Sequence, residues 1–285
     1  MIPYPSLFQS IKILVTGATG FIGQYVLKGA SRKGIQLDCL YRSDIPSSVA
    51  SLDEVNWIKS DLNFDFNSIN SNYDTILHCA CIGVSPQKAL LKEYFETNVL
   101  KSLIFIENGL LNGVKKIVSL GSSLEYGKSG EKFEFIPTTA PLLPTDNYGA
   151  SKAAFTMGLH ALEQNYTGDF RVLRPFHIYG EGQYQKNFWP HLRKTALSGK
   201  DFEMTKGEQI RDYLHVSKVA DLIIGELLQD TQDSCFMIKN LGSGKPISMK
   251  EFALEQWSQF GAKGKLKLGS VPYRKNEIMR YVPKL

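Results

Sequence analysis

The chain has 285 residues, of which 43% are hydrophobic and 21% charged, and its formal net charge is +5. This length is long for one hydrophobic core and short for two, so we expect one large domain that carries a smaller one. The Lys and Arg residues are scattered, which argues against a nucleic-acid-binding protein. No apolar stretch approaches the ~20 residues of a membrane span, and Met1–Ser10 lacks the pattern of a signal peptide, so we expect a cytoplasmic protein. No metal site is expected, because Cys79 and Cys81 lack a His/Cys pair at ligand spacing and fit buried packing.

Short β-rich runs alternate with longer helical patterns through the first 175 residues. The predicted strands are Ile11–Thr16, Leu37–Tyr41, Val55–Lys59, Thr75–Cys79, Lys116–Leu120 and Arg171–Leu173. The helices predicted between them are Phe21–Lys33, Gln87–Leu111 and Asn147–Gln164. Most of the strands are continuous apolar runs, as expected for strands buried on both faces of a parallel sheet. The alternation predicts an α/β fold with a Rossmann-type doubly wound parallel sheet.

The pattern changes after Pro175. We predict a hairpin at Asp201–Asp212, a helix at Val216–Gln229, a strand at Ser234–Asn240 and a helix at Ser248–Phe260. These shorter elements predict a smaller C-terminal lobe that folds back on the carboxyl edge of the sheet. Ligands bind at that edge in doubly wound sheets, so the lobe is expected to contact a ligand.

A glycine-rich turn follows the first predicted strand, in the stretch Thr16-Gly17-Ala18-Thr19-Gly20-Phe21-Ile22-Gly23. Glycines at this spacing permit a tight turn, close approach of the backbone to a pyrophosphate and close packing of helix on strand. The N–H groups that open the next helix would then face the phosphates, where the helix dipole favours negative charge. The turn predicts a bound dinucleotide, NAD or NADP, contacted by Gly17, Thr19, Gly20, Phe21, Ile22 and Gly23.

The choice between the two dinucleotides depends on the end of the second predicted strand, where Arg42 and Ser43 stand. Enzymes that select NAD usually place a carboxylate there for the ribose 2′-hydroxyl, whereas Arg pairs with a 2′-phosphate through charge-assisted hydrogen bonds. We therefore expect NADP to be favoured over NAD, with Arg42 and Ser43 as its contacts. Asp61 and Leu62, just past the third predicted strand, are placed to reach the adenine, although a surface loop explains this acid nearly as well.

Tyr148 and Lys152 are four residues apart in a predicted helix and so share one face. A tyrosine hydroxyl ordinarily loses its proton at about pH 10, and a neighbouring ammonium lowers that pKa by stabilising the phenolate. Ser122, at the end of the fifth predicted strand, is placed to polarise the same carbonyl oxygen. These residues predict acid–base catalysis at a carbonyl group, with Lys152 also holding the nicotinamide ribose.

Several stretches, in order along the chain, resemble the extended short-chain dehydrogenase/reductases, the NAD-dependent epimerase/dehydratase family. They are 16–23, Asn98, 121–127, 148–152, 173–180, 211–216 and 240–244. The resemblance covers nearly the whole chain and implies a Rossmann domain, NAD or NADP, and a nucleoside-diphosphate sugar as substrate. It implies further cofactor contacts from Cys79, Ala80, Cys81, Asn98, Lys152 and Pro175. It implies substrate contacts from Ser122, Ser123, Tyr148, Asn187, Arg211 and Arg274, with the two arginines at the diphosphate.

We accordingly interpret residues 1–175 as the NAD(P)-binding domain, to which 214–230 return, and 176–285 as mainly a substrate-binding lobe. Sugar 4,6-dehydratases of the family place an acid one or two positions after the Ser/Thr, where this chain has Ser123 and Leu124. Glu125 is one step further on, and in an extended strand that step points it to the other face. Dehydration is therefore disfavoured. The stretches 121–127, 207–213 and 272–279 resemble the NDP-4-keto-6-deoxyhexose reductases, including those that make CDP-abequose.

The predicted reaction is NAD(P)-dependent reduction of an NDP-4-keto-6-deoxy sugar to the 4-hydroxy sugar, with the proton supplied by Tyr148. A 4-epimerase with tightly bound NAD uses the same residues, and it differs in forming product without added reduced cofactor. A dinucleotide-binding sensor or scaffold is a third hypothesis, although it would not need Ser122, Tyr148 and Lys152. The resemblance also implies a homodimer in which two long helices of each subunit pair, here Gln87–Leu111 and Asn147–Gln164. Leu90, Leu91, Phe95, Phe155 and Met157 are the apolar side chains expected to serve that interface.

Overall fold

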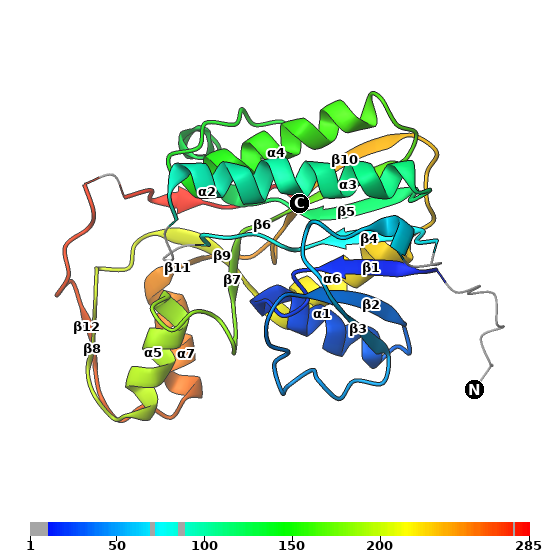
Figure 1. Ribbon diagram of the computed structural model, residues 1–285. Coiled ribbons are helices and arrows are strands. Elements are labelled where there is room, and N and C mark those ends of the chain that lie inside the picture. Colours follow the sequence, from blue (N-terminus) through cyan, green and yellow to red (C-terminus); the bar gives the residue numbers. More distant parts are fainter. Residues whose placement is uncertain (1–10, 69–71, 85–88, 276) are drawn as a thin grey trace, which may run out of the picture.

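The computed structural model describes residues 11–68, 72–84, 89–275 and 277–285 (Figure 1). Within these residues, seven strands form one parallel sheet in the order β10-β6-β5-β4-β1-β2-β3. This is the predicted doubly wound sheet. Its strands are β1 (Ile13–Thr16), β2 (Leu37–Tyr41), β3 (Val55–Lys59), β4 (Thr75–His78), β5 (Lys116–Leu120), β6 (Asp169–Pro175) and β10 (Cys235–Leu241).

Helices cover both faces of this sheet (Figure 1). On one face lie α1 (Phe21–Ser31) and α6 (Val216–Leu228), and on the other α2 (Leu91–Phe95), α3 (Ser102–Leu111) and α4 (Asn147–Glu163). The apolar strand residues are buried because each face packs on one of these helical layers. A single helix predicted at Gln87–Leu111 is interrupted by a π-helical turn at Glu96–Lys101, and its first two residues lie outside the described part of the chain.

The strands predicted at Leu37–Tyr41, Val55–Lys59 and Lys116–Leu120 are confirmed to the residue. The strand predicted at Arg171–Leu173 is longer, because its backbone pairs with β10 from Asp169 to Pro175 and with β5 from Asp169 to Leu173. Strand β10 lies at the edge of the central sheet and pairs with β6, so the chain returns to the large domain after α6.

The smaller lobe contains β7 (His177–Tyr179), α5 (Phe188–Leu197), β8 (Phe202–Met204), β9 (Ile210–His215), β11 (Pro246–Ser248), α7 (Met249–Gln259), β12 (Leu266–Leu268) and β13 (Arg280–Tyr281). The predicted hairpin at Asp201–Asp212 is wrong. In the structure β8 pairs with β12, whereas β9 pairs with β7, β11 and β13. The side chains of Phe202 and Met204 are buried between α5 and α7, and this packing separates β8 from β9. No described helix has the length and apolar character that crossing a membrane requires.

Two helical glycines give a matched test of how tightly the first turn packs. A Cβ on Gly23 would lie 2.3 Å from the Gly17 carbonyl oxygen, whereas a Cβ on Gly225 in α6 would meet nothing within 4 Å. We expect Gly23→Ala to lower the free energy of unfolding by about 2 kcal/mol or more, because backbone must shift. Gly225→Ala should raise it by about 0.5–1 kcal/mol through helix propensity. Denaturant titrations measure both, and an equal response at the two positions would contradict this packing.

Candidate active site

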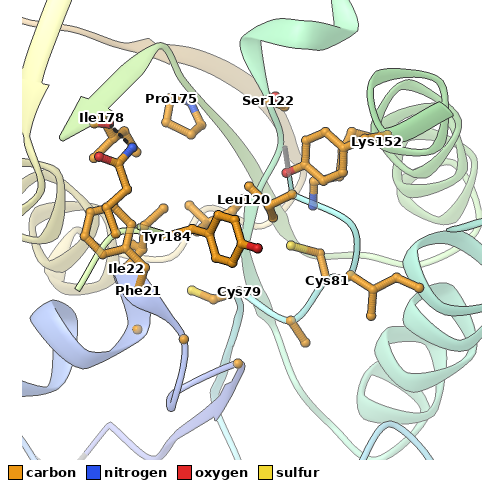
Figure 2. Close-up of a pocket in the computed structure, with 18 of the residues that line it drawn as sticks. Phe21, Ile22, Cys79, Cys81, Leu120, Ser122, Lys152, Pro175, Ile178 and Tyr184 are labelled. Carbon is orange, nitrogen blue, oxygen red and sulfur yellow. Dashed lines mark hydrogen bonds between the residues drawn. The ribbon is translucent and has the colours of Figure 1, made fainter. Parts of the chain in front are cut away.

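One cavity of about 820 Å³ opens at the carboxyl ends of the central strands and extends to α5 and α7. Most of the residues predicted from sequence line it: Gly17, Thr19, Gly20, Phe21, Ile22, Gly23, Arg42, Asp61, Leu62, Cys79, Ala80, Cys81, Ser122, Ser123, Tyr148, Lys152, Pro175 and Asn187. Figure 2 shows Phe21 and Ile22 on one side of this cavity and Ser122 and Lys152 on the other. The cavity therefore joins the glycine turn to the predicted catalytic residues.

The glycine turn has the geometry that a pyrophosphate requires. Gly17 has a φ of +70°, and a Cβ there would lie 2.5 Å from the backbone nitrogen of Ala80, so only glycine fits. A Cβ on Gly20 would meet only the Gly17 carbonyl oxygen, at 3.1 Å, and would otherwise project into open space. Helix α1 begins here without a side-chain cap and without an acid in its first turn. Its first N–H groups are thus available to an anion in the cavity.

Residues near the ends of β2 and β3 were predicted to contact the adenosine part of the cofactor. Arg42 and Asp61 line the cavity, and Asp61 also accepts a hydrogen bond from the backbone nitrogen of Asn63 at 2.8 Å. Ser43 is exposed and is not among the described residues that line the cavity. Arg42 is exposed as well as lining the cavity.

Tyr148 and Lys152 lie in the first two turns of α4, which the Asp146 side chain caps by accepting from the Gly149 nitrogen at 2.7 Å. The start of this helix is tied to the π-helical turn: the Asn98 amide donates to Ser151 Oγ at 3.0 Å, and Ser151 Oγ donates to the Tyr148 carbonyl at 2.8 Å. Asn98 is buried and does not itself line the cavity in the described residues. Its role here is to hold the catalytic helix.

The pKa of Tyr148 differs from the sequence-based expectation. Burial, followed by contact with the Cys81 thiol, raises the pKa of Tyr148 well above 10. The expected lowering by Lys152 does not dominate, because the hydroxyl lies in a poorly solvated position where the phenolate is disfavoured. A tyrosine hydroxyl is protonated at neutral pH even without this shift, so the shift leaves the resting form of Tyr148 unchanged.

Glu125 lies behind Ser122 and is completely buried. One carboxylate oxygen accepts from the Ser122 backbone nitrogen at 2.7 Å, and the other accepts from Thr156 Oγ1 at 2.9 Å and pairs with Arg174 at 2.8 Å. Burial raises the pKa of Glu125, while Arg174 and these hydrogen bonds oppose that shift. Glu125 is not among the described residues that line the cavity, although Ser123–Glu125 form a 3-10 helix and not the extended strand on which that prediction rested. Gly121 leaves the carboxylate room, since a Cβ there would lie 2.5 Å from it.

Some predicted residues lie elsewhere. Arg211 is buried, and its guanidinium donates to the carbonyls of Ile210 and Ile278 and pairs with Glu277 at 3.5 Å. Arg274 is exposed, and neither arginine is among the described residues that line the cavity. Phe155, expected at a subunit interface, is instead buried in the core between α4 and the sheet.

Other lining residues were not predicted from sequence. Thr97 and Lys101 reach the cavity from the π-helical turn, and Tyr213 and Met249 reach it from the lobe. A π-helical turn has no pattern that periodicity detects, since the surrounding residues fit an ordinary α-helix. Cys79 and Cys81, which the family resemblance implied as cofactor contacts, line the cavity as well, and the described residues contain no cluster suited to a metal ion.

The chain resembles known proteins in sequence and in fold. The model of the NAD dependent epimerase/dehydratase family matches residues 13–234. The chain belongs to this family. It is 30% identical over 271 residues to a UDP-glucose 4-epimerase of Halalkalibacterium halodurans, covering 84% of this chain and 77% of that protein. It is 24% identical over 274 residues to CDP-abequose synthase of Salmonella typhimurium, covering 94% and 87%.

A solved structure of MoeE5 in complex with UDP-glucuronic acid and NAD is similar across most of its length. Its TM-score is 0.79 at 25% identity, covering 96% of this chain and 90% of that one. Membership of the epimerase/dehydratase family makes the chain an NAD(P)-dependent oxidoreductase of the extended short-chain type. The glycine turn and the uncapped start of α1 fit the dinucleotide, whose pyrophosphate they would hold.

The contribution of the buried Glu125–Arg174 ion pair to stability can be measured. We expect Glu125→Gln to lower the free energy of unfolding by about 3–5 kcal/mol, because Arg174 is left buried without its counter-charge. Thr156→Val, which removes one hydrogen bond to the same carboxylate, should cost only about 1 kcal/mol. Denaturant unfolding measures both variants. Equal and small losses would show that the ion pair contributes nothing.

Proposed function

We propose that this chain reduces the 4-keto group of a nucleoside-diphosphate 4-keto-6-deoxyhexose, with NADPH as the favoured cofactor. The observation that carries the proposal is the convergence of Ser122, Tyr148 and Lys152 in the cavity that the glycine turn opens. Leu124 lines the cavity where dehydratases of the family place an acid, and leucine cannot transfer a proton. CDP-abequose synthase is a relative over 94% of this chain, and a dTDP-4-dehydro-6-deoxyglucose reductase of Escherichia coli is another, 28% identical.

Each residue has a defined task. The nicotinamide, when bound, supplies a hydride to the sugar carbon. Tyr148, whose hydroxyl is protonated at neutral pH, donates its proton to the carbonyl oxygen. Ser122 Oγ donates a hydrogen bond to the same oxygen as negative charge develops, a contribution of a few kcal/mol in comparable sites. Lys152 is buried in the cavity wall and holds the nicotinamide ribose.

The residues of the lobe bind the nucleotide sugar in this proposal. Asn187 is the N-cap of α5 and lines the cavity with Ser123 on the opposite domain. Tyr179, Tyr184 and Trp189 supply aromatic surface on the same side, which suits a nucleobase. Figure 2 shows Tyr184 among the side chains that surround the cavity.

A second candidate is an NDP-sugar 4-epimerase that retains its NAD. It is favoured by the UDP-glucose 4-epimerase of Halalkalibacterium halodurans, at 30% identity. The same acid–base residues serve both reactions. The two reactions differ in whether product forms without added reduced cofactor.

Three substitutions separate catalysis from cofactor binding. Tyr148→Phe should lower turnover by about two to four decades while the cofactor Kd changes little, because only the proton donor is lost. Ser122→Ala should lower turnover with a modest effect on the Kd. Lys152→Met should damage both, because its ammonium also contacts the ribose. Steady-state rates and cofactor titrations measure the pattern, and a Tyr148→Phe enzyme of near-normal rate would refute the assigned proton donor.

The cofactor preference has its own test. NADPH should bind more tightly than NADH, and Arg42→Ala should reduce that difference by about 1–3 kcal/mol through loss of a charged hydrogen bond. Fluorescence titration with both cofactors provides the values. Lys33→Ala removes a positive charge on the exposed turn after α1 and serves as a control. Equal dissociation constants for the two cofactors in the unmodified chain would exclude NADP selection.

We further propose a homodimer formed through α2, α3 and α4. Leu91, Ile104 and Met157 on these helices, and Leu100 on the π-helical turn between α2 and α3, are apolar side chains that are 46–60% exposed. Exposed apolar side chains are typical of subunit interfaces when they gather on one surface. Light scattering at micromolar concentration should give about twice the 32.0 kDa chain mass, and Met157→Asp with Ile104→Asp should halve it. A 32.0 kDa particle for the native chain would contradict the dimer.

A further inference from the structure

Lys101 is a cation that the proposed mechanism does not use. It lines the cavity, where the other cationic residues among those described are Arg42 and Lys152. Arg42 follows β2 at the ribose end, and Lys152 lies beside Tyr148 at the catalytic end. Lys101 is the last residue of the π-helical turn, so it reaches the cavity from a third element.

The π-helical turn places Lys101 in a specific relation to Glu96. Their charged groups are 3.1 Å apart, although the two residues are five positions apart in sequence. In an α-helix of 3.6 residues per turn, positions five apart do not share a face, whereas the hydrogen bonds of a π-helix join residues five apart and bring them closer to one face. Both side chains are more than 40% exposed, so this ion pair is weak and can be exchanged for another partner.

The same turn is fixed to the loop that meets the glycine turn. Asn98 accepts from the Ile82 nitrogen at 2.8 Å and donates to the Ile82 carbonyl at 3.2 Å. Two residues before Ile82, the backbone of Ala80 packs against Gly17 so closely that a Cβ on Gly17 would lie 2.5 Å from it. The loop therefore contacts the glycine turn through Ala80 and the π-helical turn through Ile82.

We propose that Lys101 is a pyrophosphate contact of the dinucleotide, and that Glu96 competes for it. In the ligand-free chain the ammonium pairs with Glu96. When a dinucleotide binds, the ammonium exchanges this exposed carboxylate for a phosphate oxygen in the cavity. The ion pair thus weakens cofactor binding by an amount that the residue at position 96 sets. This concerns the cofactor site of the family and does not depend on which sugar is reduced.

Calorimetric titration with NAD⁺ tests the proposal without requiring turnover, because the only phosphates of NAD⁺ are those of the pyrophosphate. Lys101→Met should weaken NAD⁺ binding by about five- to twentyfold, the range for losing a partly solvated charged hydrogen bond. Glu96→Gln should tighten it by about two- to fivefold, since an exposed pair is weak. The double variant should bind as Lys101→Met does, because Glu96 acts only through Lys101. Lys92→Met, an exposed change of the same charge on α2, should alter binding by less than about twofold.

Two further titrations distinguish the other anions. NADP⁺ should lose the same factor as NAD⁺ in Lys101→Met, whereas a loss confined to NADP⁺ would place Lys101 at the 2′-phosphate and refute the proposal. UDP alone should bind the native chain and Lys101→Met equally. A loss confined to UDP would assign Lys101 to the substrate diphosphate and likewise refute the proposal. Unchanged NAD⁺ binding in a folded Lys101→Met protein, or weaker binding in Glu96→Gln, would also overturn it.

Discussion

The buried carboxylate of Glu125 connects the elements on which the active site depends. It accepts hydrogen bonds from the backbone nitrogen of Ser122, just after β5, and from the Thr156 hydroxyl on α4. It also forms an ion pair with Arg174 on β6. These elements carry Ser122, then Tyr148 and Lys152, and then Pro175. A buried ion pair is stabilising only when its remaining hydrogen-bonding groups are satisfied, and Arg174 donates further to Tyr126 Oη and to the Thr138 carbonyl. The arrangement thereby fixes Ser122 relative to α4 without placing a charge in the cavity.

In the part of the cavity beside the glycine turn, the first backbone N–H groups of α1 have no side-chain cap. Gly20 adds no side chain between the turn and the cavity. A side-chain N-cap stabilises a helix by about 1 kcal/mol, and α1 lacks one. An anion bound at this helix start would accept the hydrogen bonds that a capping side chain otherwise accepts. The two halves meet at the loop from Cys79 to Val84, which packs on Gly17 and is held by Asn98.

The sequence was sufficient for the central sheet, for the glycine turn and for the placement of Ser122, Tyr148 and Lys152 in one cavity, because each depends on local patterns. Apolar runs such as Lys116–Leu120 are confirmed as strands, and Tyr148 and Lys152 share a helix face because they are four residues apart. What failed depends on partners distant in the chain. The strand pairing of Phe202–Met204 with Leu266–Leu268 joins segments over 60 residues apart, which a local hairpin pattern conceals. The pKa of Tyr148 was likewise misjudged, because burial of its hydroxyl outweighs the charge of Lys152, and burial is not visible in spacing.

In the proposed reaction the chain transfers hydride from an added reduced cofactor to the sugar, whereas an epimerase needs no added cofactor. Incubation with an NDP-4-keto-6-deoxyhexose and NADPH deuterated at the transferred position measures this directly, by mass spectrometry of the sugar product. The account predicts a product one mass unit heavier, with one equivalent of NADPH oxidised for each molecule formed. A 4-epimerised NDP-hexose that forms from an NDP-hexose without added cofactor and without deuterium, while the keto sugar stays unreduced, would contradict it.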